Sequence, residues 1–231
     1  MWSRPSRRSA IADVRETSDL SLALFYVPRP HRFLVTSLFD LDAAMGEVVR
    51  TTSEPMVGQI RLAWWRERLE ELDRGIVPAE PHLQAAADIV VQGKVTGAEL
   101  GALADRWVAL LEPFPWDEDV AEAISERGRG LFGMGARIAG AAEAEAQAAG
   151  GVWALVDVAR HCTDPQSREQ LVTAARNLAS SLEGVAEEKA RPLTMLGLLA
   201  RRDLDRWPEV EQEATPARAW LMIRHRLTGR L

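Results

Sequence analysis

Proline and glycine recur at the ends of the apolar-periodic stretches of this chain, and they divide it into about nine helix-like segments. Ser18 can cap a short helix that ends before Pro28, and three further helix starts can be named. Thr96 with Glu99 forms a capping box, Asp164 precedes a proline at the first helical position, and Thr215 does the same. No segment shows the alternation of a half-buried strand, and tyrosine occurs once. We therefore predict an all-α protein.

The expected helices form one domain. Residues 1–17 are interpreted as a lead-in and residues 18–231 as a single helical domain. Punctuation and capping signals predict helices that end before Pro28 or cover about 30–51, 55–72, 81–92, 97–112, 118–142, 150–162, from 165, 187–206 and 215–228.

Bulk properties exclude several classes of function. The net charge of −6 does not supply the basic face of a general nucleic-acid binder. The single cysteine, Cys162, cannot form an internal disulfide, which favours a reducing, cytoplasmic location. No apolar run is long enough to span a membrane. Peripheral contact stays open, because the C-terminal "ARAWLMIRHRLTGRL" combines an apolar face with arginines; an ordinary closing helix is the alternative.

The stretch "PMVGQIRLAWWRERLEEL" places two tryptophans among arginines and glutamates. Trp65 lies on an apolar stripe, and Trp64 is turned by about 100° to lie over Ile60, so we expect both indoles to be packed. Arg61 and Arg66 either pair with neighbouring glutamates or bind an anionic ligand. The stripe consists of Leu62, Trp65, Leu69 and Leu72.

Acidic residues in "SLFDLDAAMGEVV" are candidates for metal binding. On a helical wheel Asp40 and Glu47 lie together, away from the apolar stripe, and Asp42 lies on its flank. Ala44 and Gly46 occupy the positions four residues after the two aspartates, so this helix lacks the convergent acids of a magnesium site. We predict no metal ligands here.

Two further motifs have structural interpretations. Asp157 and Arg160 share a helical face in "GGVWALVDVARHC", and we expect them to form a surface ion pair. The glycines of "ERGRGLFGMGARIAG" do not have the spacing of a phosphate loop, and close helix–helix approach explains them better.

Six segments carry a family resemblance: "LALFYVPRPHR", "LFDLDAAMGEVV", "SEPMVGQIRLAWWRERLEEL", "PHLQAAADIV", "RGRGLFGMGARIAG" and "VWALVDVARH". In this order, over about residues 19–163, they resemble the squalene/phytoene synthase family. The Arg-x-x-Trp-Trp-Arg run from Arg61 to Arg66 is the most specific piece. The resemblance implies an isoprenoid synthase-like helical bundle around a central cavity. In that family two prenyl diphosphates are joined head to head, with Mg²⁺ held by aspartate-rich motifs on facing helices.

The chain departs from both family motifs. The place of the first, Asp-Asp-x-x-Asp, is taken by Ala44, Met45 and the residues 46–49 that follow, with Glu47 as a displaced acid. In the second motif only Arg160 is retained intact. The chain is thus more similar to a degenerate branch of the family, which includes a mitochondrial assembly factor for respiratory complex I.

Three hypotheses follow. The first is a non-catalytic protein that binds an isoprenoid or lipid, or acts as an assembly factor, at a membrane surface. The second is an active prenyltransferase whose relocated Mg²⁺ site uses Asp42, Glu47, Asp157 and Asp164, with Arg160 on diphosphate; these side chains should then converge on one cavity. The third is a structural partner protein with a filled core.

Overall fold

The computed structural model describes residues 18–231, and the regular elements of this part are ten α-helices and two short 3₁₀ helices. The all-α prediction is confirmed. The α-helices are α1 (Asp19–Phe25), α2 (Arg29–Thr51), α3 (Pro55–Glu71), α4 (Pro81–Val91), α5 (Gly97–Val108), α6 (Glu118–Ala139), α7 (Glu143–His161), α8 (Pro165–Ala179), α9 (Arg191–Arg206) and α10 (Pro216–Thr228); the 3₁₀ helices are η1 (Leu72–Arg74) and η2 (Ala109–Leu111).

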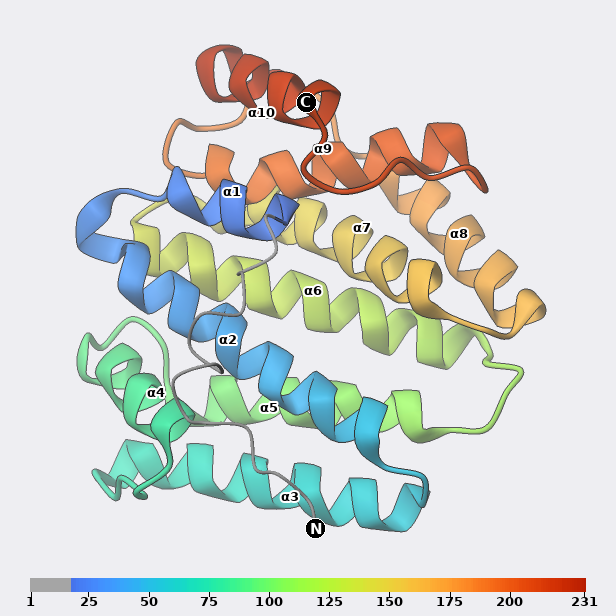
Figure 1. Ribbon diagram of the computed structural model, residues 1–231. Coiled ribbons are helices and arrows are strands. Elements are labelled where there is room, and N and C mark those ends of the chain that lie inside the picture. The colour runs from blue at the N-terminus through green and yellow to red at the C-terminus, as the bar shows by residue number, and fades with distance from the viewer. Residues whose placement is uncertain (1–17) are drawn as a thin grey trace, which may run out of the picture.

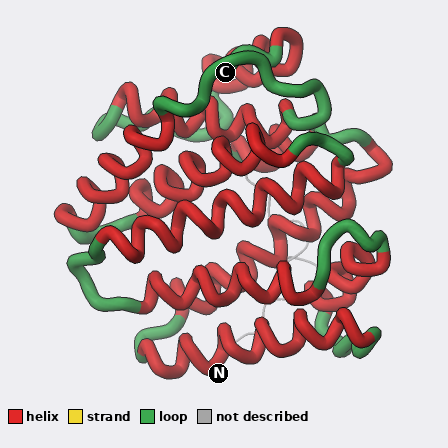
Figure 2. Tube along the Cα trace, turned by 180° about the vertical axis from the view of Figure 1, so that it is seen from behind, coloured by secondary structure: helices red, strands yellow, loops and turns green. Residues whose placement is uncertain are grey.

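The helices are stacked side by side, from α3 at one end of the molecule to α10 at the other (Figure 1). Between these ends, α5, α6, α7 and α9 follow one another in contact, and the view from behind shows the same stack (Figure 2). Helix α2 lies across α4, α5 and α6, while α1 contacts both α9 and α10. This arrangement places α6 between α5 and α7, with α2 lying across α5 and α6.

Local capping explains most of the helix starts. Ser18 and Thr96 each form a capping box, and Asp164 and Thr215 accept hydrogen bonds from the third residue of their helices, as their positions predict. The expected start near residue 187 is wrong. Helix α9 begins at Arg191, because the preceding residues form turns before the proline in the first turn of the helix.

Helices α6 and α7 pack with their backbones in near contact. A Cβ atom built on Gly128 would lie 2.1 Å from the carbonyl oxygen of Gly150, and one on Gly150 would lie 2.2 Å from that of Gly128. No side chain fits at such distances, so glycine is required on both helices. The interpretation of the glycine-rich segment as a helix-packing surface is confirmed.

The centre of the bundle is filled by aromatic side chains. The ring of Phe39 on α2 lies 5.4 Å from that of Phe132 on α6, and Trp153 on α7 lies 5.2 Å from Phe132 and 6.2 Å from Phe39. Such edge-on and tilted contacts are typical of packed cores. The predicted central cavity is therefore not confirmed where these three rings pack together.

The tryptophan pair of α3 divides between core and surface. Trp65 is buried along with the other residues of its stripe, as predicted. The prediction that Trp64 is also packed is wrong: 43% of it is exposed, and the neighbouring Ile60 is exposed as well. Helix α3 is at the end of the stack, and no other helix of residues 18–231 lies beyond it.

No helix within residues 18–231 combines the length and the apolar character needed to cross a bilayer.

Candidate functional site

A pocket of about 600 Å³ lies between the C-terminal ends of α2 and α7. We call it the aromatic pocket. Its wall combines α2, the end of α5 with the loop that follows, and the end of α7 with its C-terminal extension. The lining residues are Gly46, Val49, Arg50, Trp107, Leu110, Phe114, Trp116, Asp157, Val158, His161, Cys162 and Thr163.

The shape of the aromatic pocket depends on Gly46. A Cβ atom at this position would lie 2.8 Å from the indole of Trp107, so only glycine lets the ring reach the surface of α2. On the other side, Phe114 and Trp116 form a tilted pair with ring centroids 4.7 Å apart. Three aromatic rings therefore line one pocket, which suits an apolar or planar group.

A buried ion pair joins α2 to α6 behind the wall of the aromatic pocket. The Asp42 carboxylate accepts a hydrogen bond of 2.5 Å from Arg127 Nη1 and one of 2.9 Å from the indole N–H of Trp107. The Arg127 guanidinium lies 4.1 Å from the centroid of the Trp107 ring, and Arg127 is only 1% exposed. Asp42, Trp107 and Arg127 form a cluster that we call the buried triad.

The buried triad leaves part of the guanidinium without oxygen partners. Within residues 18–231, Nε and Nη2 of Arg127 have no hydrogen-bond acceptor. The ring of Trp153 lies 5.8 Å from Arg127 on the side of the aromatic core. Cation–π attraction from two indoles offsets part of the desolvation of the charge. The arginine is thus held by one carboxylate and two rings.

The electrostatics of Asp42 follow from its burial. Desolvation raises the pKa of this carboxyl above its ordinary value, Arg127 and the Trp107 N–H oppose the change, and the nearby charge of Asp157 adds to it. Both oxygens of Asp42 are engaged by Arg127 and Trp107, and Asp42 is not among the residues that line the aromatic pocket.

Asp157 is the only one of the four candidate acids on the wall of the aromatic pocket. The prediction that Asp157 forms an ion pair with Arg160 is wrong. Arg160 binds Asp203 at 2.8 Å, and Asp157 lies 3.9 Å from Nδ1 of His161. Arg160 turns away because Asp203 on α9 offers it a more deeply buried carboxylate.

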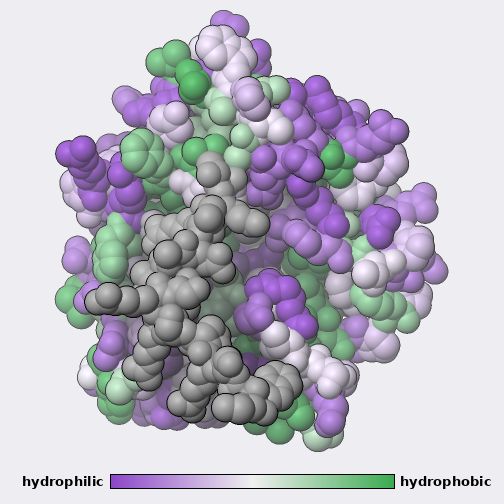
Figure 3. All heavy atoms as spheres, viewed as in Figure 1, coloured by the Kyte–Doolittle hydropathy of each residue, from purple (hydrophilic) through white to green (hydrophobic). Residues whose placement is uncertain are grey.

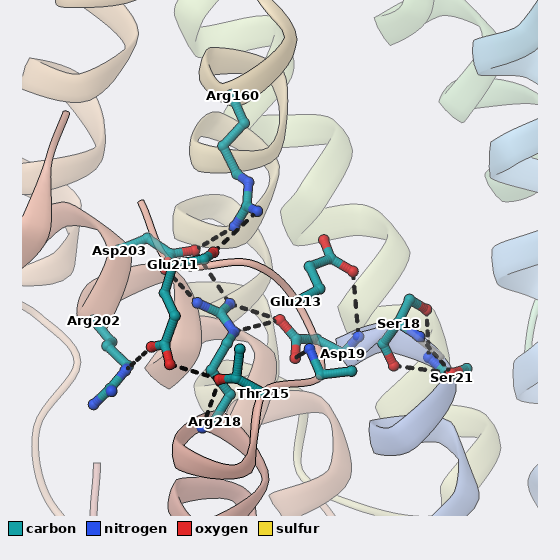
Figure 4. A network of polar contacts seen from close by, with 11 residues as sticks. Ser18, Asp19, Ser21, Arg160, Arg202, Asp203, Glu211, Glu213, Thr215 and Arg218 are labelled. Atoms are coloured by element: carbon teal, nitrogen blue, oxygen red, sulfur yellow. Dashed lines mark hydrogen bonds and ion pairs between the residues drawn. The ribbon is translucent and has the colours of Figure 1, made fainter. Parts of the chain in front are cut away.

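A second polar cluster joins α1, α7, α9 and α10 (Figure 4). Arg218 at its centre is buried and binds Asp19 Oδ2 at 2.6 Å, and it also pairs with Asp203, which Arg160 approaches from the other side. Burial alone lowers the pKa of Arg218, but hydrogen bonds and charge from Asp203 and Asp19 more than offset this and raise it. Arg160 is therefore part of a structural network.

The other predicted site residues have local partners. Glu47 binds Arg50 at 2.8 Å on the surface, and Asp164 caps α8 through Ser167. Arg61 donates to Thr52 Oγ1 at 3.1 Å, and Arg66 lies 3.4 Å from Asp105 and 3.8 Å from Glu70. Neither of these two arginines lines the aromatic pocket. The four acids of the prenyltransferase hypothesis thus do not converge on one cavity.

A magnesium site requires oxygen ligands that converge on one point. Within the described part of the chain, no three histidine, cysteine, aspartate or glutamate side chains lie close enough together to hold a metal ion. Both oxygens of Asp42 already accept hydrogen bonds, and Asp157 is the one carboxylate among the residues that line the aromatic pocket. The residues present do not fit the family's Mg²⁺ cluster.

Sequence reasoning missed Arg127 and Trp107. Arg127 occurs between Ile124 and Leu131 on the buried stripe of α6, and a charge on such a stripe signals a buried partner. Asp42 on the flank of another apolar stripe was the matching signal. The pairing of Asp42 with Arg127 could not be predicted from local sequence, because the two residues are 85 positions apart and meet only when α2 packs on α6.

The chain was compared with family models, with curated proteins and with solved structures, and it matches none of them. The resemblance to squalene/phytoene synthases consequently remains a hypothesis that rests on the sequence segments quoted above.

Proposed function

We propose that this chain is a non-catalytic squalene/phytoene synthase-like protein that binds an isoprenoid or a related lipid in the aromatic pocket. One observation carries the proposal. The Asp42 carboxylate of α2 is bonded to Arg127 and to the pocket-lining Trp107, and the pocket beside that indole is lined mainly by apolar and aromatic side chains.

The size and lining of the aromatic pocket support a lipid ligand. Its volume of about 600 Å³ lies within the range of small-molecule sites. The rings of Trp107, Phe114 and Trp116 offer contacts to an isoprenoid chain, while Arg50 and His161 supply polar groups for a headgroup. Arg50 pairs with Glu47 on the surface, where an ion pair contributes little to the free energy of folding. An anionic headgroup can therefore compete with Glu47 for Arg50.

The absence of convergent acids argues against catalysis. Departure of diphosphate develops negative charge that clustered divalent ions normally stabilise. In this chain Asp157 is the one candidate acid on the pocket wall, and the other three are engaged elsewhere. We therefore expect binding without turnover. Action as an assembly factor remains a further prediction, which requires a protein partner to be found.

The proposal is tested with purified protein, farnesyl and geranylgeranyl diphosphate, and the corresponding alcohols, with and without Mg²⁺. Calorimetry measures binding, and product analysis measures turnover. Leu110→Trp fills the pocket and should weaken binding of every ligand by about tenfold or more. Arg50→Ala should weaken the diphosphates more than the alcohols, since a charge-assisted hydrogen bond is lost.

Two matched controls accompany these variants. Val91→Trp adds an indole at a position on α4 that is 82% exposed, and Arg74→Ala removes an exposed arginine at η1, outside the pocket lining. Both should leave affinity unchanged. Formation of a head-to-head product, abolished by Asp157→Ala, would overturn the proposal in favour of the prenyltransferase hypothesis. Failure of every ligand to bind would overturn it in favour of a structural protein.

A further inference from the structure

Helix α10 is docked onto the domain by its polar side. Its buried residues are Arg218, Met222 and His225, which follow one another at helical spacing. Arg218 binds the carboxylates of Asp203 and Asp19, and His225 Nε2 lies 2.9 Å from the hydroxyl of Thr194 on α9. These directional contacts fix the rotation of the helix about its axis.

The outward side of α10 is apolar as a result. Trp220 is 67% exposed, Leu227 is 75% exposed, and Ile223 lies between them on the same stripe and is also exposed. Residues 218 and 220 differ by about 200° around a helix, so this stripe lies opposite the buried one. A helix on the surface of a soluble domain normally has the reverse distribution. Figure 3 shows hydrophobic residues exposed beside hydrophilic and near-neutral ones at the top of the molecule, over α10.

Positive charge surrounds this apolar stripe. Residues 216–231 contain four arginines and no acid, although the chain as a whole carries a net charge of −6. Arg224 and Arg230 are exposed, and Arg226 pairs with Glu188 at 3.3 Å. A tryptophan, two aliphatic side chains and adjacent arginines are the composition of a helix that lies in the interface of an anionic bilayer.

We propose that α10 docks this protein on an anionic membrane surface. Trp220, Ile223 and Leu227 enter the interface, while Arg224 and Arg230 contact lipid phosphates. A second copy of the chain is a poorer occupant, because a symmetric pair of α10 helices would bring like charges together without acids in this segment to compensate them. The inference is independent of the proposed function, because no residue of α10 lines the aromatic pocket.

Vesicle flotation of the full chain tests this inference. Phosphatidylcholine vesicles with and without about one third phosphatidylglycerol are compared at low and high salt. Binding is expected to the anionic vesicles at low salt, and to fall at high salt as the charges are screened. Trp220→Glu with Leu227→Glu should lower the partition coefficient by about a hundredfold, since each buried apolar side chain contributes about tenfold. Arg224→Gln with Arg230→Gln should lower binding to anionic vesicles specifically.

Val77→Glu with Val91→Glu is the matched control, because it also places two carboxylates at exposed apolar positions, far from α10 in the stack. Circular dichroism and thermal melting establish that every variant is folded. Equal binding of the wild type and the Trp220/Leu227 variant would overturn the inference. So would absence of vesicle binding, or self-association of the wild type in sedimentation that the same variant abolishes. These outcomes differ from a failure of prenyl-ligand binding, which is measured without vesicles.

Discussion

The buried triad allows a quantitative prediction about stability. Arg127→Met removes the guanidinium but keeps most of the apolar volume, and it leaves Asp42 with only the indole N–H of Trp107. Because both charged residues are almost fully buried, loss of one partner should lower the free energy of unfolding by about 3–5 kcal/mol. Asp42→Leu should have a similar cost, since it leaves Arg127 without a carboxylate.

The double variant Asp42→Leu/Arg127→Met separates pairing from volume. It removes both charges together, so its loss of stability should be well below the sum of the two single losses, with a coupling energy of about 2 kcal/mol or more. Urea denaturation followed by circular dichroism measures all four proteins. Glu47→Leu and Arg50→Met form a control cycle at an exposed pair, where the coupling should be at most about 0.5 kcal/mol.

The pH dependence of Arg127→Met adds a second readout. Burial raises the pKa of Asp42, and loss of Arg127 raises it further because the opposing charge is gone. The folded state then binds a proton at higher pH than the unfolded state, so stability is lost as pH rises above about 4 and is regained as pH falls. The deficit of the variant should be smaller at pH 5 than at pH 8. Additive single effects with a deficit independent of pH would refute this reasoning.

Three further predictions concern helix packing, the second polar cluster and the buried histidine of α10. Gly150→Ala should lower the free energy of unfolding by about 1–3 kcal/mol or more, as seen by urea denaturation, because its Cβ would meet the backbone of Gly128 at 2.2 Å. Arg218→Met should cost about 3–5 kcal/mol by leaving Asp203 and Asp19 short of a partner, and should make residues beyond 206 sensitive to limited proteolysis. Burial lowers the pKa of His225, so the unfolded state binds the proton more readily and Tm should fall as pH drops below about 6.5; His225→Leu should remove this slope.

Local signals predicted the helices well because capping and periodicity act over a few residues. Thr96 and Asp164 cap the helices that their positions indicated, and the glycines of α6 lie at a close helix contact. The start of α9 was misplaced because a turn with helix-compatible residues precedes Arg191. The start of α7 was also misplaced: this helix begins at Glu143 and not near residue 150, because the alanine-rich stretch before Gly150 is helical.

The candidate site was less predictable because its partners are distant in sequence. Asp42 meets Arg127 and Trp107 only when α2, α5 and α6 are assembled. Arg160 pairs with Asp203 on α9 and not with Asp157 on its own helix, and no sequence pattern within α7 predicts a partner on α9. The outward apolar stripe of α10 is visible in the sequence, but which side faces the domain is decided by Arg218 and its two carboxylates.

The most direct test of the central claim is photo-crosslinking with a farnesyl diphosphate analogue that carries a photoreactive chain, followed by mass spectrometry of the labelled peptides. We predict label on segments 46–50, 107–116 and 157–163, competition by unlabelled farnesyl diphosphate, loss of label in Leu110→Trp, and recovery of the unlabelled ligand chemically unchanged after incubation with Mg²⁺. Label confined to other segments, or conversion of the ligand to a coupled product, would contradict the claim that the aromatic pocket binds an isoprenoid without turning it over.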